Sequence, residues 1–138
     1  MVKEKFETLK KAYEKLNRLL EKSEELNDND YLEMRRDAII KRYEFTFELC
    51  WKTIKLYLEE EGLGVFLSPK AVAKEAFRVG VIQKGDVFLD MIEDRNLSVH
   101  TYDEAIADEI YESIKTKYIF EIRKIIRFFE EYLKWNLE

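Results

Sequence analysis

One uninterrupted stretch decides the fold: residues 31–61 read YLEMRRDAIIKRYEFTFELCWKTIKLYLEEE and contain neither glycine nor proline. Apolar residues recur in it every three or four positions, which is the spacing of one face of an α-helix. This row is Ile39, Tyr43, Phe47, Cys50 or Trp51, Ile54 and Leu58. A second apolar row, formed by Phe45, Leu49 and Leu56, lies on a different side. Because a helix that is apolar on two sides is buried on two sides, we expect a long central helix whose second side meets another subunit.

The segments on either side of this stretch predict further helices. Before it, apolar residues at helical spacing run from Phe6 to Leu20, and Asn27-Asp28-Asn29-Asp30 ends that pattern. After it, Gly62-Leu63-Gly64 breaks the central helix. Ser68-Pro69 reads as an N-cap followed by proline at the first helical position, and Gly80 suits the end of the resulting short helix.

Two more helices complete the expected order of long, long, two short, long. Gly85-Asp86 starts the second short helix. A long helix should then run from about Tyr102 to Leu133. Its apolar stripe is Ile110, Ile114, Tyr118, Ile122, Ile125, Phe129 and Leu133.

Composition supports an all-α fold and excludes several classes of protein. The 138 residues are enough for one domain, residues 1–138, and the 24 Lys and Arg against 29 Asp and Glu give a net charge of −5. Four glycines and one proline are too few for a sheet with many turns. We therefore expect an antiparallel up-down bundle of about five helices.

Targeting and metal binding are also restricted by the sequence. No apolar run approaches the roughly 20 residues that cross a membrane, and the amino terminus lacks a signal peptide, so a cytoplasmic protein is the default expectation. One cysteine, Cys50, and one histidine, His100, exclude an internal disulfide and a multi-cysteine zinc site. We expect no metal site and no cofactor bound to this chain.

The only histidine lies in a stretch that suits chemistry on a phosphodiester, RNLSVHTY at residues 95–102. On a continuous helix Asn96 and His100 share a face, whereas Arg95 and His100 are about 140° apart. An imidazole exchanges protons near neutral pH, and a guanidinium grips phosphate oxygens in pairs. Together they can move a proton and stabilise the charge of a phosphorane, and in RNA the 2′-hydroxyl is an internal nucleophile. Candidate catalytic residues from this chemistry are therefore Arg95 and His100.

A plainer interpretation of the same residues stays open. His100 can be a helix-terminal residue that caps a carbonyl or pairs with Asp94 or Asp103. An arginine five positions from a lone histidine is a common coincidence in a chain this rich in charge. Residues Asp90, Glu93 and Asp94 can orient Arg95 or simply be solvated. Glu48 can point into a cleft, although the rim of the core is the favoured place for it.

Clusters of basic residues offer a further site for phosphate groups. One cluster is Arg35, Arg36, Lys41 and Arg42, and the other is Lys115, Lys117, Arg123, Lys124 and Arg127. Both are interleaved with carboxylates or apolar residues, so exposed helix faces are the default interpretation.

At these residues the sequence resembles the HEPN domain family. The stretch from Arg95 to His100, with Tyr102 two positions later, is similar to the family's R-N-x-x-x-H signature followed by x-Y. The resemblance extends over essentially the whole chain. It includes the aromatic stretch 42–52, the segment Ser68-Pro69-Lys70 and the run 75–82. It is closest to the subunit encoded beside a minimal nucleotidyltransferase, described as a substrate-binding protein or as a HepT-like toxin.

The resemblance implies specific roles and partners. Arg95 and His100 match the ribonuclease pair, Asn96 matches the polar residue after the arginine, and Tyr102 matches the tyrosine to which the partner transfers AMP. It also implies a homodimer with both signatures on one cleft. RNA would be the substrate, and the partner nucleotidyltransferase antitoxin would use ATP and Mg²⁺.

Two classes of function follow as expectations. The first is a toxin of a toxin–antitoxin pair, a metal-independent endoribonuclease neutralised by AMPylation. The alternative is a non-catalytic substrate-binding or regulatory subunit of a minimal nucleotidyltransferase. The chain is not itself that transferase, because none of its glycines, Gly62, Gly64, Gly80 and Gly85, is followed by serine, as the nucleotide-binding loop of such enzymes requires.

Overall fold

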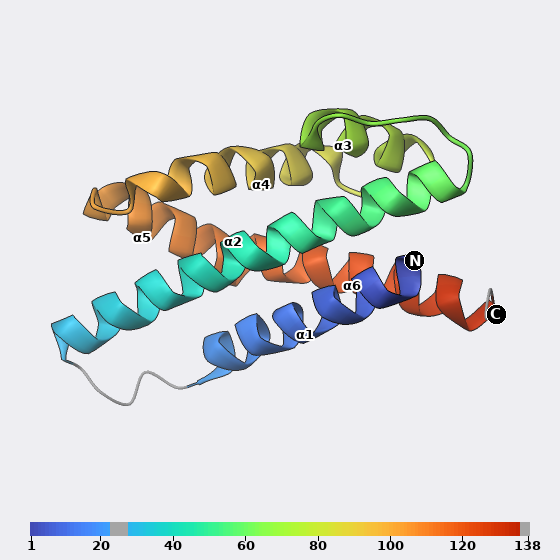
Figure 1. Ribbon diagram of the computed structural model, residues 1–138. Coiled ribbons are helices and arrows are strands. Elements are labelled where there is room, and N and C mark those ends of the chain that lie inside the picture. The colour runs from blue at the N-terminus through green and yellow to red at the C-terminus, as the bar shows by residue number, and fades with distance from the viewer. Residues whose placement is uncertain (23–27, 136–138) are drawn as a thin grey trace.

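The computed structural model describes residues 1–22 and 28–135, and over these residues it contains helices and no strand. Figure 1 shows an up-down arrangement in which α2 runs antiparallel to α1 and to α4, and the two termini lie at the same end. The elements are α1 (Val2–Glu21), α2 (Asn29–Glu60), α3 (Pro69–Arg78), α4 (Gly85–Leu97), the 3₁₀ turn η1 (Ser98–His100), α5 (Glu104–Ser113), the π-helical segment η2 (Ile114–Tyr118) and α6 (Ile119–Trp135). The all-α bundle predicted from the sequence is confirmed.

The central helix α2 uses its apolar row as predicted. Its buried apolar residues are Ile39, Ile40, Tyr43, Phe47, Cys50, Ile54 and Leu58. In the second row, Leu49 and Leu56 are half-buried and pack against the core of this one chain, while Phe45 is 58% exposed. The second row therefore does not by itself require another subunit, because α1 already packs along α2.

Side-chain caps fix the starts of three helices. Asp28 accepts a hydrogen bond from the backbone N–H of Asp30, so the residues expected only to end the first helix also start α2. Asn27 of that predicted break lies outside the described residues. Ser68 accepts from the N–H of Ala71 with Pro69 at the first helical position, as predicted. Asp103 accepts from the N–H groups of Ala105 and Ile106 and starts α5.

The last predicted helix is a continuous rod from α5 through η2 to α6, and its middle is π-helical. The apolar stripe predicted for it is buried from Ile110 to Phe129. Three successive steps of four residues, from Ile110 to Ile122, drift around an α-helix by about 120° because one turn takes 3.6 residues. The wider π turn takes up this drift and keeps the stripe facing the core.

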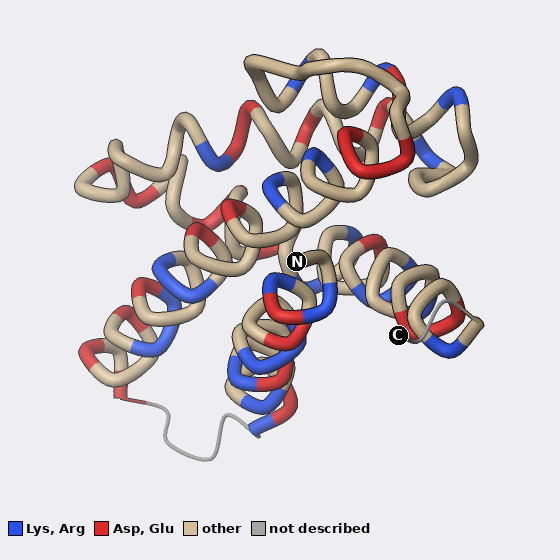
Figure 2. Tube along the Cα trace, turned by 45° about the vertical axis from the view of Figure 1, so that its right-hand side comes forward, with Lys and Arg blue, Asp and Glu red and all other residues tan. Residues whose placement is uncertain are grey.

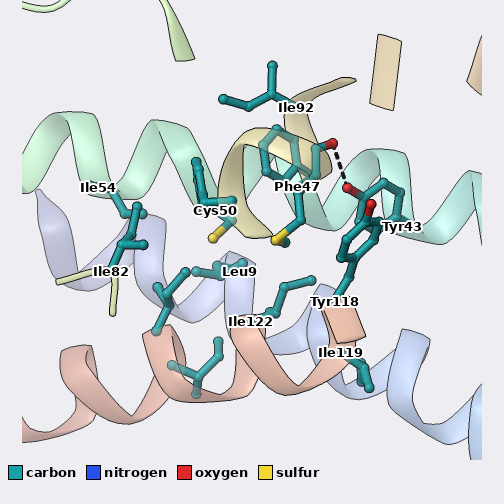
Figure 3. Packing of buried hydrophobic residues seen from close by; sticks show 14 of the residues in the cluster. Leu9, Tyr43, Phe47, Cys50, Ile54, Ile82, Ile92, Tyr118, Ile119 and Ile122 are labelled. Carbon is teal, nitrogen blue, oxygen red and sulfur yellow. Dashed lines mark hydrogen bonds between the residues drawn. The ribbon is translucent and has the colours of Figure 1, made fainter. Parts of the chain in front are cut away.

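Two stacked tyrosines hold α4 against the rest of the core. The Tyr43 hydroxyl of α2 donates a hydrogen bond to the backbone carbonyl of Met91 in α4, at 2.7 Å (Figure 3). The rings of Tyr43 and Tyr118 stack with centroids 5.5 Å apart, and the Tyr118 hydroxyl donates to the Asp94 carboxylate. Burial raises the pKa of Tyr43 well above its usual value, so its hydroxyl keeps the proton that it donates. These two tyrosines therefore fix the carboxyl-terminal end of α4 against α2 and η2.

No helix among the described residues is long and apolar enough to cross a bilayer. Cys50 is a buried free cysteine, and burial raises the pKa of its thiol to about 12. It is a small core residue, as predicted.

Candidate functional site

The candidate site lies where α4 ends and the chain turns into α5. Arg95 is in the last turn of α4, and η1 then tightens the backbone over Ser98–His100. The Ser98 hydroxyl donates to the carbonyl of Arg95 and is buried, so it helps to close this turn. His100 and Tyr102 lie on the exposed side, with Tyr102 81% exposed. The break in the helix means that the separation of Arg95 and His100 expected on a continuous helix does not apply.

Arg95 is held by a carboxylate from the central helix. Its Nη2 lies 2.9 Å from Oε1 of Glu48, and the Lys52 ammonium lies 3.5 Å from the other oxygen of that carboxylate. The Arg95 side chain is 37% exposed, but its Nε is buried and makes no hydrogen bond. Glu48 thus fixes the position of Arg95 and leaves part of its donor capacity unused, which suits binding of an anion.

His100 is paired with the neighbouring tyrosine. Its Nδ1 lies 3.0 Å from the Tyr102 hydroxyl oxygen, and the two rings meet edge to face. When Nδ1 carries no proton, it accepts a hydrogen bond from the Tyr102 hydroxyl, and Nε2 then carries the imidazole proton.

Behind the turn, Asp94 and Tyr118 form a half-buried pair. Desolvation raises the pKa of Asp94, and it does so although the hydrogen bond from Tyr118 favours the ionised carboxylate. Burial and the adjacent carboxylate raise the pKa of Tyr118. Asp94 therefore faces the core, and the predicted pairing of Asp94 with Arg95 or His100 does not form among the described residues.

The structure brings the predicted site residues to one short segment but does not join them all. Arg95 pairs with Glu48, and His100 pairs with Tyr102. No hydrogen bond or ion pair joins Arg95 to His100 within the described residues. Asn96 is exposed one position after Arg95. A phosphate contacted by both Arg95 and His100 would have to bridge the two pairs from outside.

Metal binding finds no support in the described residues, since they contain no group of three or more His, Cys, Asp or Glu placed to hold an ion. Asp90 and Glu93 are exposed on α4.

Two features escaped the sequence reasoning. Arg35, expected on an exposed face, is buried, and its guanidinium donates to the carbonyls of Leu19 and Lys22 and to the Tyr111 hydroxyl. It closes the carboxyl-terminal end of α1, which ends without a glycine. The partnership of Glu48 with Arg95 was also missed, because a contact between residues 47 positions apart has no local signal in the sequence.

Comparisons with known proteins find one family and structures of a similar fold. A family model described as "Nucleotidyltransferase substrate binding protein like" matches residues 4–131. A Thermus thermophilus crystal structure is 32% identical with a TM-score of 0.74, over 86% of this chain and 95% of that one. A Haemophilus influenzae protein, described as having the fold of a substrate binding domain of a nucleotidyltransferase, is 22% identical with a TM-score of 0.73, over 88% of this chain and 96% of that one. Among curated proteins, none matches significantly.

Proposed function

The chain belongs to the nucleotidyltransferase substrate binding protein-like family, and from this membership we propose that it is the substrate-binding or regulatory partner of a separate nucleotidyltransferase. The observation that carries the proposal is the family match over 4–131, which spans every helix from α1 to most of α6. The Haemophilus influenzae neighbour supports the fold of this assignment. The chain lacks the Gly-Ser loop of a transferase, so the transferase activity must come from the partner.

Tyr102 is the group that we propose the partner modifies. Its phenol is exposed on a turn between two helices, where a second protein can reach it. In this reaction the phenolic oxygen bonds to the α-phosphorus of ATP, the bond to the pyrophosphate leaving group breaks, and the phenolic proton is released. Nδ1 of His100 lies 3.0 Å from that oxygen and can take the proton. The chain would then be both the partner and the substrate of the transferase.

The test is to incubate the chain with the nucleotidyltransferase encoded beside it, ATP and Mg²⁺, and to map added AMP by peptide mass. We expect AMP on Tyr102 and none on that peptide in Tyr102→Phe. Tyr111 is a matched control, because its hydroxyl is partly buried beside Arg35. A stable complex of the two proteins without AMP transfer would favour a purely binding role. Absence of both complex and modification would reject the proposal.

A second candidate function is the metal-independent endoribonuclease of the HEPN toxins. The observation that favours it is the desolvated Nε of Arg95, together with an exposed imidazole five residues later. In the reaction the ribose 2′-oxygen attacks the neighbouring phosphorus and the 5′-oxygen leaves, giving a 2′,3′-cyclic phosphate. Arg95 would stabilise the phosphorane, and His100 would move the proton. AMP on Tyr102 would place an anion beside Arg95 and block the RNA phosphate, so the two candidate functions are compatible.

We also propose that two copies associate around this turn. The apolar side chains of Leu97 and Val99 flank His100 and are 43% and 66% exposed. Apolar residues so exposed beside a polar site are typical of an interaction surface. A second copy placed there would bring a second Arg95 and His100 to one cleft.

A further inference from the structure

One face of α1 carries a row of cations that form no ion pair with any described residue. Lys11, Lys15, Arg18 and Lys22 follow one another at steps of four, three and four residues, so they lie within about 60° of each other around the helix. Arg42 of α2 lines two grooves together with Lys15. All five side chains are exposed. We name these five residues the cationic strip.

The strip differs from the other basic residues of the molecule in its surroundings. No ion pair joins any of its five members to a carboxylate among the described residues, whereas Lys10, Lys41 and Lys52 each have such a partner. Acidic residues of α1 nevertheless lie close to the strip. Glu7 is one turn before Lys11, and Glu14 and Glu21 line a groove together with Lys11, Lys15 and Arg18. Among the described residues the five cations therefore make no ion pair, although carboxylates lie nearby, in a chain whose net charge is −5.

Beside the strip is a groove between α1 and α2 with a volume of about 530 Å³. Lys11, Lys15 and Arg42 line it together with the apolar side chains of Phe45 and Leu49. Glu48, the residue that holds Arg95, lines the same groove. The groove thus runs from the strip to the candidate site. In Figure 2, segments of Lys and Arg alternate with segments of Asp and Glu along α1.

We propose that the cationic strip binds the sugar–phosphate backbone of a single-stranded nucleic acid and leads it along the groove to Arg95. From Lys11 to Lys22 the strip rises about 16 Å, and at roughly 3.4 Å per phosphate this length matches about five phosphates of one strand. A single row of cations suits one strand rather than the two of a duplex. Phe45, 58% exposed beside the groove, offers a ring on which a base stacks. The proposal deepens the ribonuclease candidate, but binding by the strip does not need cleavage.

Salt dependence tests the strip directly. Fluorescence anisotropy of labelled oligo(U) and of oligo(dT), which has no 2′-hydroxyl and is not cleaved, would be measured with the full chain between 50 and 200 mM NaCl. Five phosphate contacts predict a slope of log K against log salt of about −3.5, which is a loss of about 100-fold in affinity over this range. Lys15→Gln with Arg18→Gln should reduce the slope to about −2.1. Lys70→Gln with Lys74→Gln on α3 changes the net charge by the same amount and should leave the salt slope unchanged.

Phe45→Ala tests the stacking separately. It should weaken binding by about tenfold at every salt concentration without changing the slope, because stacking releases no counterions. Circular dichroism and light scattering on each variant would confirm that fold and association state are unchanged. An unchanged affinity in Phe45→Ala would reject the stacking.

Several results would overturn the strip itself. These are no binding of either oligonucleotide, equal slopes for the strip and α3 variants, duplex bound as tightly as single strands, or phosphatidylserine vesicles bound more tightly than either. Oligo(dT) binding that depends on the strip, with no cleavage of oligo(U), would support the strip and reject the ribonuclease. Cleavage that persists unchanged in the strip variants would support the ribonuclease and reject the strip.

Discussion

At the scale of single residues, Arg95 is the group on which the proposed phosphate chemistry depends most. Glu48 fixes one end of its guanidinium, and its Nε is out of contact with both water and protein acceptors. The side chain as a whole is 37% exposed, so the rest of the guanidinium can still meet a phosphate oxygen. His100 has the complementary property, since its ring is exposed and one nitrogen is already oriented by Tyr102.

Substituting either residue should abolish RNA cleavage without unfolding the chain. For His100→Ala we expect a fall of about 10² to 10⁴ in rate, because general acid–base catalysis contributes that much. The rate of Arg95→Ala should fall by a comparable factor, because the charge of the phosphorane is no longer stabilised. The measurement is cleavage of labelled RNA with identification of 2′,3′-cyclic ends, with and without EDTA. Lys84→Ala, exposed before α4, is the control. Cleavage that stops on chelation would point to a metal instead.

Asp94 should make stability fall as pH rises. Its pKa is raised in the fold above the ordinary 3.8, so between these values the folded chain holds a proton that the unfolded chain has released. Stability from this group is therefore highest below pH 3.8 and is lost as pH rises through the folded pKa. The side chain introduced by Asp94→Asn would be neutral at every pH and would still accept the hydrogen bond from Tyr118. The free energy of unfolding of Asp94→Asn, measured in urea, should therefore rise relative to that of the native protein between pH 4 and pH 7.

The matched comparison for that prediction is Glu93→Gln, one position away and exposed. The difference in free energy of unfolding between Glu93→Gln and the native protein should stay constant over the same pH range. If the difference for Asp94→Asn were equally constant, it would contradict a raised pKa of Asp94.

How much of the candidate site the sequence could predict depends on whether a residue's neighbours are local. The cluster of Arg95, Asn96, His100 and Tyr102 needed only eight consecutive residues, which the structure places at the end of α4, in η1 and just after it. Glu48 was assigned to the rim of the core because nothing local distinguishes it from any other helical glutamate. Its pairing with Arg95 is a property of how α2 and α4 pack.

At the scale of elements, spacing and caps predicted most helix positions. Ser68 with Pro69 fixed the start of α3 to the residue, because their roles are set by local backbone chemistry. The π segment was not predicted, although its signal was present as repeated steps of four in the last stripe. Arg35 was misjudged because its charge suggested exposure, whereas the open carbonyls at the end of α1 supply buried acceptors.

Removing the Arg35 side chain should therefore destabilise the whole bundle. Arg35→Ala leaves the carbonyls of Leu19 and Lys22 without their donor, and we expect a loss of about 2–4 kcal/mol in the free energy of unfolding. Denaturant titration with circular dichroism measures this. Lys41→Ala, an exposed cation of the same helix, should change stability by less than about 0.5 kcal/mol. Equal effects of the two substitutions would show that Arg35 does not close α1.

At the scale of the whole molecule, the charges are distributed unevenly. The net charge of −5 gives no general attraction to a polyanion, yet the cationic strip places five cations along one edge, and none of them forms an ion pair within residues 1–22 and 28–135. The apolar turn at Leu97 and Val99 is a separate surface. If both proposals hold, one surface would bind nucleic acid while the other binds protein.

The protein should be a dimer at micromolar concentration. A stable interface buries about 1,000 Å² or more per protomer, which is about an eighth of the 8425 Å² surface of this chain. Multi-angle light scattering should give twice the chain mass, and Leu97→Glu with Val99→Glu should give a monomer that keeps its helix content. Leu67→Glu, exposed on the loop before α3, should leave the dimer intact. A native protein of single-chain mass would reject the shared cleft.

The π segment at Ile114–Tyr118 has a consequence for comparing related sequences. A residue inserted into an α-helix either rotates everything after it by about 100° or is absorbed as a bulge, and this rod shows the bulge. A relative one residue shorter in this segment would keep both α5 and α6 in phase with the core and lose only the wide turn. When such sequences are aligned, the gap belongs inside the longest helical rod, where gaps are ordinarily disallowed, and not in the loops that flank it.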